Sequence, residues 1–258
     1  MRLLKFYKYQ GTGNDFVMID NREQVFDTKN HALITRLCDR KFGIGADGLI
    51  LLNLHPAYDF EMVYYNADAS LSMCGNGSRC VVHLAHHLGM IQEQTTFIAA
   101  DGIHEASIKD GLIYVKMNDV TSIKSVENGY FLNTGTRHYV RLVENLSEFD
   151  VFIQGRKIRY NDAFQPEGTN ANFIEFDGNE VSMRIYEKGV ENETLSSGTG
   201  VTAVALVAAS LKNLQSPVKV KTRGGELQIS FEQMGKDKFS NIYMAGPAVM
   251  VFEGTVFV

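Results

Sequence analysis

Two short segments carry side chains that could move protons at the start of a helix. They are Cys74-Gly75-Asn76-Gly77 and Ser197-Gly198-Thr199-Gly200. Each places a thiol or a hydroxyl before two glycines, which let the backbone approach a ligand closely, and each precedes an apolar stretch. A helix N-terminus presents unpaired backbone N–H groups and the positive end of the helix dipole. Such a terminus holds a carboxylate and favours the thiolate form of a cysteine. We therefore expect acid–base chemistry on a small anionic substrate.

The apolar stretch after each segment has helical spacing, and the two stretches match at one constant offset. The matching apolar positions are Val81, Leu84, Ala85 and Leu88 after the first segment, and Val204, Val207, Ala208 and Leu211 after the second. This spacing indicates one buried face of a helix. The match continues, since Phe97 corresponds to Val220 and Gly102 to Gly225. A chain that repeats its own helix start predicts two copies of one unit. If the copies face each other, the two helix starts would act on both faces of one carbon.

The segments around these helices alternate like strands and are separated by tight glycine turns. Helices are predicted at 30–41, 75–89 and 198–212, with strands at 3–9, 15–20, 48–53, 60–66, 95–100, 103–109, 112–118, 130–134, 138–143, 171–176, 181–187, 218–223, 226–231, 241–245 and about 249–258. Strands wrapped around one central helix, twice over, predict an α+β fold of two similar, pseudo-symmetric domains with antiparallel or mixed sheets. We expect an N-terminal half over 1–118, joined by the strand at 247–258, and a C-terminal half over 119–246.

Composition and charge narrow the class of protein. A chain of 258 residues with 45% hydrophobic and 21% charged residues fits two ordinary globular domains. The formal charge of −5 gives no electrostatic reason to expect nucleic acid or an anionic membrane as a partner. No apolar run approaches the roughly 20 residues of a membrane span. Because the first residues are typical of a strand rather than of a signal peptide, we expect a cytoplasmic protein.

The three cysteines differ in their expected roles. An odd count without metal-type spacing argues against a disulfide scaffold and a metal centre. Cys38 and Cys80 fall inside predicted helices and are interpreted as buried, inert thiols. Cys74 stands at a helix start, and is the candidate for chemistry.

Three other motifs point to cofactors but lack the context that those cofactors need. Gly11-Thr12-Gly13-Asn14-Asp15-Phe16 precedes a predicted strand, whereas a dinucleotide fingerprint opens a helix. Gly43-Ile44-Gly45-Ala46-Asp47-Gly48 follows a helix and opens a strand, the reverse of the required order. His83 and His87 have i, i+4 spacing but no evident third ligand, so a polar helix face is favoured over a metal site. We expect neither a cofactor nor a metal.

Taken in order along nearly the whole chain, five segments resemble the diaminopimelate epimerase family. They are Gly11-Thr12-Gly13-Asn14-Asp15-Phe16, Gly43-Ile44-Gly45-Ala46-Asp47-Gly48, Asn66-Ala67-Asp68, Cys74-Gly75-Asn76-Gly77, and Glu187 followed by Glu193-Thr194-Leu195-Ser196-Ser197-Gly198-Thr199-Gly200. The segment around Cys74 is the most specific of them.

The resemblance implies an isomerase that interconverts LL- and meso-diaminopimelate, a step of lysine and peptidoglycan precursor synthesis. Family members need neither pyridoxal phosphate nor a metal, and they work in the cleft between two similar domains. A thiolate removes the α-proton from one face while a thiol protonates the other face, which is general acid–base catalysis. Backbone donors must stabilise the charge that develops on the substrate carboxylate. The resemblance also implies a small-molecule substrate and a homodimer.

The same resemblance assigns roles to individual residues. Cys74 and Ser197 occupy the two acid–base positions, with His138 assisting Cys74 and Glu187 assisting the opposite side. The implied substrate-binding residues are Asn14, Asn66, Gly75, Asn76, Thr136, Asn170, Glu187, Lys188, Gly198 and Thr199. Judged without the resemblance, the asparagines could simply stabilise turns, His138 could be structural, and Glu187 with Lys188 could be a solvated ion pair.

Three positions depart from the family pattern. Ser197 stands where the second cysteine is expected, and a serine hydroxyl is a poor base near neutral pH without strong activation. An engineered substitution, a natural variant with altered chemistry and a pseudoenzyme all fit this serine; we favour a substitution on an otherwise epimerase-like chain, with impaired turnover. Thr136 replaces an expected asparagine. Lys188 replaces an expected arginine and offers a point charge in place of a bidentate fork.

Two alternatives to diaminopimelate epimerisation stay open. The chain could be a related racemase or dehydratase of another amino acid, since a cysteine opposite a hydroxyl residue resembles the dehydratase arrangement. It could also be a catalytically silent amino-acid-binding protein, which Ser197 motivates. Product analysis and proton exchange at the α-carbon separate these hypotheses.

Overall fold

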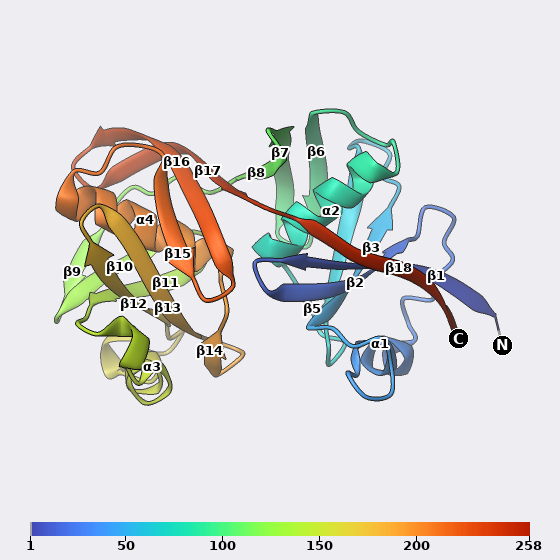
Figure 1. The fold of residues 1–258 in the computed structure, drawn as a ribbon, viewed down its shortest axis with the longest axis horizontal. Coiled ribbons are helices and arrows are strands. Elements are labelled where there is room, and N and C mark those ends of the chain that lie inside the picture. The colour runs from blue at the N-terminus through green and yellow to red at the C-terminus, as the bar shows by residue number, and fades with distance from the viewer. Residues whose placement is uncertain (1) are drawn as a thin grey trace. The chain divides into compact units, whose positions relative to one another are not determined.

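Each of the two glycine-led helices lies in its own unit of the chain. The computed structural model describes residues 2–258. Unit 1 comprises the chain up to Val115 together with Gly246–Val258, and unit 2 comprises Lys116–Ala245. Figure 1 labels the helices and strands of both units.

Unit 1 is a mixed sheet with a helix on each face. Its strands are β1 (Leu3–Gly11), β2 (Asn14–Asp20), β3 (Gly48–Asn53), β4 (Phe60–Asn66), β5 (Leu71–Ser72), β6 (Gln94–Ala99), β7 (Gly102–Lys109), β8 (Leu112–Lys116) and β18 (Val249–Phe257), and its helices are α1 (His31–Cys38) and α2 (Gly75–His87). Strands β2 and β3 run parallel, as do β4 and β6. The pairs β18–β1, β1–β2, β3–β4, β6–β7 and β7–β8 are antiparallel.

Unit 2 has the same plan. Its strands are β9 (Lys124–Val126), β10 (Gly129–Asn133), β11 (Arg137–Leu142), β12 (Asn170–Asp177), β13 (Glu180–Glu187), β14 (Asn192–Thr194), β15 (Val218–Thr222), β16 (Gly225–Gly235) and β17 (Lys238–Gly246); its helices are α3 (Val151–Arg159) and α4 (Gly198–Lys212), and short 3-10 turns lie at Leu146–Glu148 and Asp162–Phe164. Strands β11 and β12 run parallel, as do β13 and β15. The pairs β9–β10, β10–β11, β12–β13, β15–β16 and β16–β17 are antiparallel.

The order and direction of the elements therefore repeat. In both units the first parallel pair is linked through a short helix, α1 or α3, and the second through a long helix, α2 or α4. Gly102 and Gly225, matched in sequence, begin equivalent strands with positive φ values of 130° and 137°. The predicted α+β fold of two similar sheet-and-helix units is confirmed.

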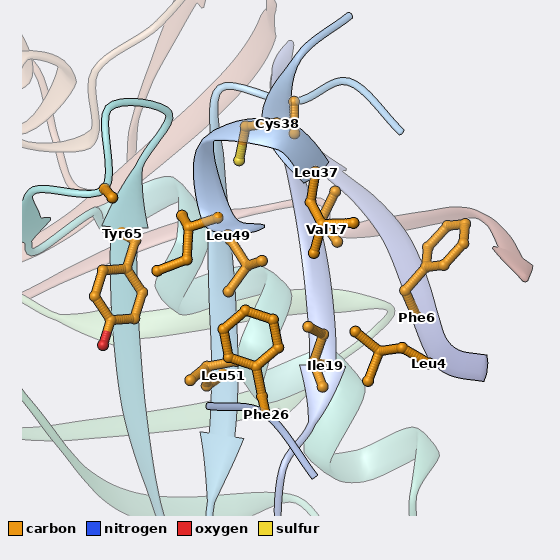
Figure 2. Close-up of a cluster of buried hydrophobic side chains, with 13 residues drawn as sticks. Leu4, Phe6, Val17, Ile19, Phe26, Leu37, Cys38, Leu49, Leu51 and Tyr65 are labelled. Atoms are coloured by element: carbon orange, nitrogen blue, oxygen red, sulfur yellow. The ribbon is translucent and has the colours of Figure 1, made fainter. Parts of the chain in front are cut away.

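The core of unit 1 explains why its central strands are apolar on both faces. Val17 and Ile19 of β2 and Leu49 and Leu51 of β3 lie in one cluster with Leu37 of α1 (Figure 2). Helix α2 packs against β1, β2, β3 and β4. A sheet covered on both faces needs near-continuous apolar strands, and β3 (Gly48–Asn53) is buried at its first five positions.

The two long helices differ in how fully they are buried. In α2 the predicted apolar stripe of Val81, Leu84 and Ala85 has no exposed surface. In α4 nearly every residue from Gly198 to Ala209 is buried, as is typical of a helix that is apolar all round. It packs against β10, β11, β12, β13, β15 and β16 of unit 2 (Figure 1). None of the helices formed by residues 2–258 is long and apolar enough to cross a membrane.

One predicted boundary and one missed helix need correction. Helix α1 was expected to reach residue 41 but ends at Cys38, because the Asp39 carboxylate accepts hydrogen bonds from the backbone N–H groups of Lys41 and Phe42. Such local bonds compete with helix continuation. Helix α3 was not predicted at all. Its central Gly155 lowers helix propensity, yet a Cβ there would lie 2.3 Å from Tyr186 Cβ, so the glycine permits close packing on β13.

Candidate active site

The start of α2 places the Cys74 thiol between a donor and an acceptor. Cys74 is the N-cap residue, with φ −138° and ψ 114°. Its Sγ accepts a hydrogen bond from the Gly77 backbone N–H at 3.4 Å and donates one to Asn14 Oδ1 at 3.3 Å. The N–H donor favours the thiolate and the carbonyl acceptor favours the thiol. Both forms that an acid–base residue must adopt are therefore stabilised.

Asn14 and Asn76 lie beside this thiol, as the sequence predicted for substrate-binding residues of one site. Asn14 is the first residue of β2, and its Oδ1 also accepts from Asn76 Nδ2 at 3.4 Å. Asn76 is buried in the first turn of α2 and its Oδ1 accepts from Arg79 at 3.1 Å. With Gly75, these residues form the Cys74 side of the candidate site.

Asn66 holds a turn at the end of β4. Its Nδ2 donates to Ser70 Oγ at 2.9 Å and its backbone N–H donates to Ser70 O. It pairs with Gly48 across the β3–β4 ladder, next to Asp47. These contacts give Asn66 the turn role considered from sequence; its substrate contact stays a prediction.

The start of α4 has the same backbone conformation but a different side-chain partner. Ser197 is the N-cap residue with φ −139° and ψ 122°, and its hydroxyl makes no capping bond within the part of the chain that the structure describes. It instead lies near the Glu187 carboxyl, whose pKa it lowers. Thr194 Oγ1 donates a hydrogen bond to Glu187 Oε1. Ser197 and Glu187, both predicted catalytic, are thus brought together.

The environment of Glu187 suits a proton acceptor. Burial raises the pKa of its carboxyl above the ordinary 4.5, and the hydrogen bonds from Thr194 and Ser197 oppose this only in part. A general base works best when its pKa approaches the working pH. A carboxyl with a raised pKa, in contact with a hydroxyl, can take the proton that the hydroxyl gives up.

His138 is a neutral positioning residue within unit 2. It has no exposed surface, and burial lowers its pKa to about 3. Asn172 Nδ2 lies 3.2 Å from Nδ1 and also donates to Tyr139 O, which fixes the amide orientation. Nδ1 therefore accepts, and Nε2–H donates to Thr136 Oγ1 at 2.9 Å. Thr136 Oγ1 in turn donates to Thr199 Oγ1 at 3.1 Å.

These contacts place His138 behind the start of α4. Both ring nitrogens are occupied by partners in unit 2, and an imidazole of such low pKa stays neutral at neutral pH. The expected assistance of His138 to Cys74 stays a prediction. Within unit 2 the histidine orients Thr136 and, through it, Thr199.

Asn170 and Lys188 lie next to each other at the ends of β12 and β13. Asn170 Oδ1 accepts from the Lys188 backbone N–H at 2.8 Å, and its Nδ2 donates to Arg137 O at 3.0 Å. The amide of Asn170 is thus hydrogen-bonded to backbone groups, whereas Lys188 is exposed. Their roles toward substrate stay predictions.

The second glycine of each segment serves helix packing rather than ligand access. A Cβ on Gly77 would lie 2.9 Å from Ile50 Cδ1, and one on Gly200 would lie 2.8 Å from Asn172 Oδ1. Both positions face the sheet of their own unit. These two glycines therefore let each helix approach its sheet closely, and their approach to a ligand stays a prediction.

Three neighbours of the site were missed by sequence reasoning. Asp47 bonds Asn14, Thr194 bonds Glu187, and Asn172 bonds His138. Asp47 and Thr194 lie inside segments that carried the family resemblance, so that resemblance was the available signal. Asn172 had none, because only the register of β11 beside β12 brings it to His138. Residues 2–258 contain no group of three or more His, Cys, Asp or Glu side chains that could hold a metal.

Solved structures share the fold at low sequence identity. A PhzF-family phenazine biosynthesis protein of Bacillus anthracis superposes with a TM-score of 0.78 at 13% identity and full coverage of both chains. A hydroxyproline epimerase of Agrobacterium vitis superposes with a TM-score of 0.65 at 13% identity, covering 99% of this chain and 92% of the other. The chain thus has the fold of these proteins, a duplicated α+β unit with one long helix in each copy.

Sequence comparison identifies the family. The sequence model of the diaminopimelate epimerase family matches residues 6–123 and 130–251. A diaminopimelate epimerase of Flavobacterium psychrophilum is 50% identical over 257 residues, covering 98% of this chain and all of that protein. One of Aquifex aeolicus is 37% identical over 275 residues, covering 97% of each. The chain belongs to the diaminopimelate epimerase family.

Proposed function

We propose that this protein interconverts LL- and meso-diaminopimelate by proton transfer at the α-carbon without a cofactor. The observation that carries the proposal is the 50% identity, end to end, with a diaminopimelate epimerase. The reactive placement of Cys74, between the Gly77 N–H and the Asn14 carbonyl, supports the same chemistry. The substrate's carboxylates suit the two helix starts, because helix N-termini bind anions.

On the Cys74 side, the thiolate removes the α-proton. The Sγ–H bond forms as the Cα–H bond breaks, and the electron pair moves into the substrate carboxylate. Backbone N–H groups at Gly75, Asn76, Gly198 and Thr199 are the proposed donors for the developing charge. In the reverse direction the Cys74 thiol returns its proton. Asn14 Oδ1 accepts from the thiol when it is protonated, and the Gly77 N–H supports the thiolate.

On the Ser197 side, a two-step relay replaces the thiol. The Ser197 hydroxyl takes the α-proton as its own proton passes to the Glu187 carboxylate, which lies near it. In the opposite direction, protonated Glu187 gives a proton to Ser197 Oγ, which protonates the carbanion. The coupling compensates for the weak basicity of a free serine hydroxyl. A thiol needs no such helper, so Ser197 slows turnover relative to cysteine.

Proton exchange in heavy water tests both halves. Deuterium incorporation at the α-carbon is followed by nuclear magnetic resonance, and isomer ratios by chiral chromatography. We expect Ser197→Cys to raise interconversion by about 10²-fold or more. Glu187→Gln should lower the rate of interconversion by about 10²-fold in the otherwise unchanged protein, and by much less in the Ser197→Cys variant. Glu180→Gln is the matched control, because Glu180 lies at the far end of β13 and pairs with exposed Lys221.

Each other outcome would replace the proposal with a stated alternative. Binding of diaminopimelate by calorimetry, with no α-exchange at any pH, indicates an amino-acid-binding protein. Loss of water with formation of an imine indicates a dehydratase. Exchange at another amino acid but not at diaminopimelate indicates a different racemase. An unchanged rate in Ser197→Cys, with substrate still bound, contradicts the two-sided scheme.

A role in lysine biosynthesis and a cytoplasmic location are part of the same proposal. All three cysteines carry thiols rather than disulfides, and the cytosol keeps thiols reduced. Cell fractionation, together with restored growth of a diaminopimelate-epimerase-deficient bacterium, tests this part. Absence of the protein from the cytoplasmic fraction would contradict the location.

A homodimer is proposed from the surface of unit 1. Strand β18 pairs with β1 and exposes apolar side chains along its length, including Val251 at 55% and Phe257 at 62%. Edge strands with exposed apolar side chains favour pairing with another chain. Sedimentation velocity should show a dimer that Val251→Lys weakens; a monomer at micromolar concentration would contradict it.

A further inference from the structure

Asp47 contacts the side chain that faces the Cys74 thiol. It lies immediately before β3, and its Oδ2 accepts a hydrogen bond from Asn14 Nδ2 at 2.7 Å. The same oxygen accepts from the Asp15 backbone N–H at 3.2 Å. Its other oxygen, Oδ1, accepts from Arg40 Nη2 at 2.7 Å. Asp47 takes no part in the proton transfers proposed above.

The carboxylate fixes which end of the Asn14 amide faces the cysteine. An ionised carboxylate only accepts hydrogen bonds, so the Asn14 NH₂ group must point to Asp47. The amide carbonyl then points the other way, to Cys74 Sγ at 3.3 Å and Asn76 Nδ2 at 3.4 Å. The opposite orientation would set an NH₂ group against another NH₂ group and a carbonyl against a carboxylate.

The carboxylate is itself held in place. Arg40 bridges Asp47 and Asp15, and Lys8 pairs with Asp15 at 2.6 Å. Burial alone would raise the pKa of Asp15, but hydrogen bonds from Arg40 and Lys8 hold it at about 2. The Asp15 carboxylate is therefore charged near neutral pH and holds the Arg40 side chain that also bonds Asp47.

We propose that Asp47 is a positioning residue that orients the Asn14 carbonyl toward Cys74 and so stabilises the protonated thiol. The inference rests on the proposed acid–base role of Cys74. The inference assigns two separate roles: the Gly77 N–H stabilises the thiolate, and Asn14, held by Asp47, stabilises the thiol. A cysteine that must both take and give a proton needs this balance.

Asp47→Asn tests the proposal because it reverses one hydrogen-bond direction. The carbonyl of the introduced amide stays with Arg40, whose charged group makes the stronger hydrogen bond, so the new NH₂ group faces Asn14 and the Asp15 backbone N–H loses its acceptor. The Asn14 amide then flips and presents its own NH₂ group to Cys74, which favours the thiolate. We expect the pH midpoint of Cys74 alkylation by iodoacetamide, followed by peptide mass spectrometry, to fall by about one unit, the equivalent of one hydrogen bond.

A double-variant comparison separates this effect from general damage. In an Asn14→Leu background the carbonyl is already absent, so Asp47→Asn should move the midpoint no further. Asp59→Asn is the matched control: Asp59 is another unit 1 carboxylate, bonded to Thr95 and Thr96, and its loss should leave the midpoint unchanged. If Asp47→Asn does not fold, Asn14→Leu alone must still lower the midpoint.

The proposal is overturned by an unchanged or raised midpoint in folded Asp47→Asn, or by an equal shift in the Asn14→Leu background. An unchanged midpoint in Asn14→Leu alone also overturns it. Alkylation needs no substrate, so these results stand whether or not diaminopimelate is turned over. Failure of the proposed function appears in the exchange experiment, and failure of this inference appears in the alkylation profile.

Discussion

The two long helices begin with nearly the same backbone and with different chemistry. Cys74 and Ser197 have φ values of −138° and −139° and ψ values of 114° and 122°. The Cys74 thiol caps its own helix through the Gly77 N–H and faces the Asn14 carbonyl, whereas the Ser197 hydroxyl lies near the Glu187 carboxyl. The duplicated fold thus gives the Cys74 thiol and the Ser197 hydroxyl the same position at a helix start. The residues of neighbouring strands give each of them a different environment.

The comparison also shows what each side chain requires. A thiol at a helix start is acidic enough to act with neutral partners alone. A hydroxyl is not, and at Ser197 a carboxyl with a raised pKa lies within hydrogen-bond reach. In the proposed mechanism, Ser197 and Glu187 together do on one side what Cys74 does alone on the other.

The largest expected effect comes from removing the thiol. Cys74→Ala should reduce deuterium exchange at the α-carbon by about 10³-fold or more, because no other group on its side takes the proton. Cys80→Ala is the control, since Cys80 is fully buried and burial raises the pKa of its thiol to about 12. Equal losses in the two variants would mean that Cys74 acts through structure, and the comparison of the two helix starts would fail.

A second test compares the equivalent glycines. Gly200→Ala should lower the free energy of unfolding by about 1–3 kcal/mol, because the new methyl group displaces Asn172, which holds His138. Gly77→Ala should cost about 1 kcal/mol or less, since it meets the flexible ends of Ile50 and Met62 and alanine favours the helix. Denaturant unfolding measures both. The reverse ranking would show that the α4 start is the more tolerant of the two.

A third test concerns pH. His138 has a folded pKa of about 3 against an ordinary value of 6.5. The unfolded chain therefore binds a proton first as the pH falls, and stability present above pH 6.5 is lost by roughly 1.4 kcal/mol per unit below it. His138→Gln should flatten this slope between about pH 6.5 and 4 relative to the unchanged protein. Identical slopes would mean that the imidazole is protonated in the folded state.

Sequence periodicity predicted most of the elements, for reasons visible in the structure. Helix α4 has its predicted bounds because Ser197-Gly198 begins it and its apolar residues continue to the last turn. Strands of two-residue period such as β13 were found because one face packs against α4. Helix α3 was missed because its central glycine is explained only by Tyr186, a residue distant in sequence.

The sequence allowed us to predict which residues form the candidate site, but not which hydrogen bonds they make. Cys74, Ser197 and Glu187 were identified from motifs, but the proximity of Ser197 to Glu187 depends on how β13 ends beside α4. The partners of Asn14 likewise depend on the parallel pairing of β2 with β3, which sets Asp47 beside it. Such contacts arise from strand register, and local sequence does not encode register by itself.

The pairing of β18 with β1 has a consequence for folding during synthesis. Strand β1 is synthesised before unit 2, yet its antiparallel neighbour β18 is synthesised after it. Unit 2 is one uninterrupted stretch and can assemble during synthesis, whereas the sheet of unit 1 lacks β18 until unit 2 has been made. Closing so long a loop is entropically costly and slow. The sheet of the Cys74 half is therefore completed only after unit 2 has been synthesised.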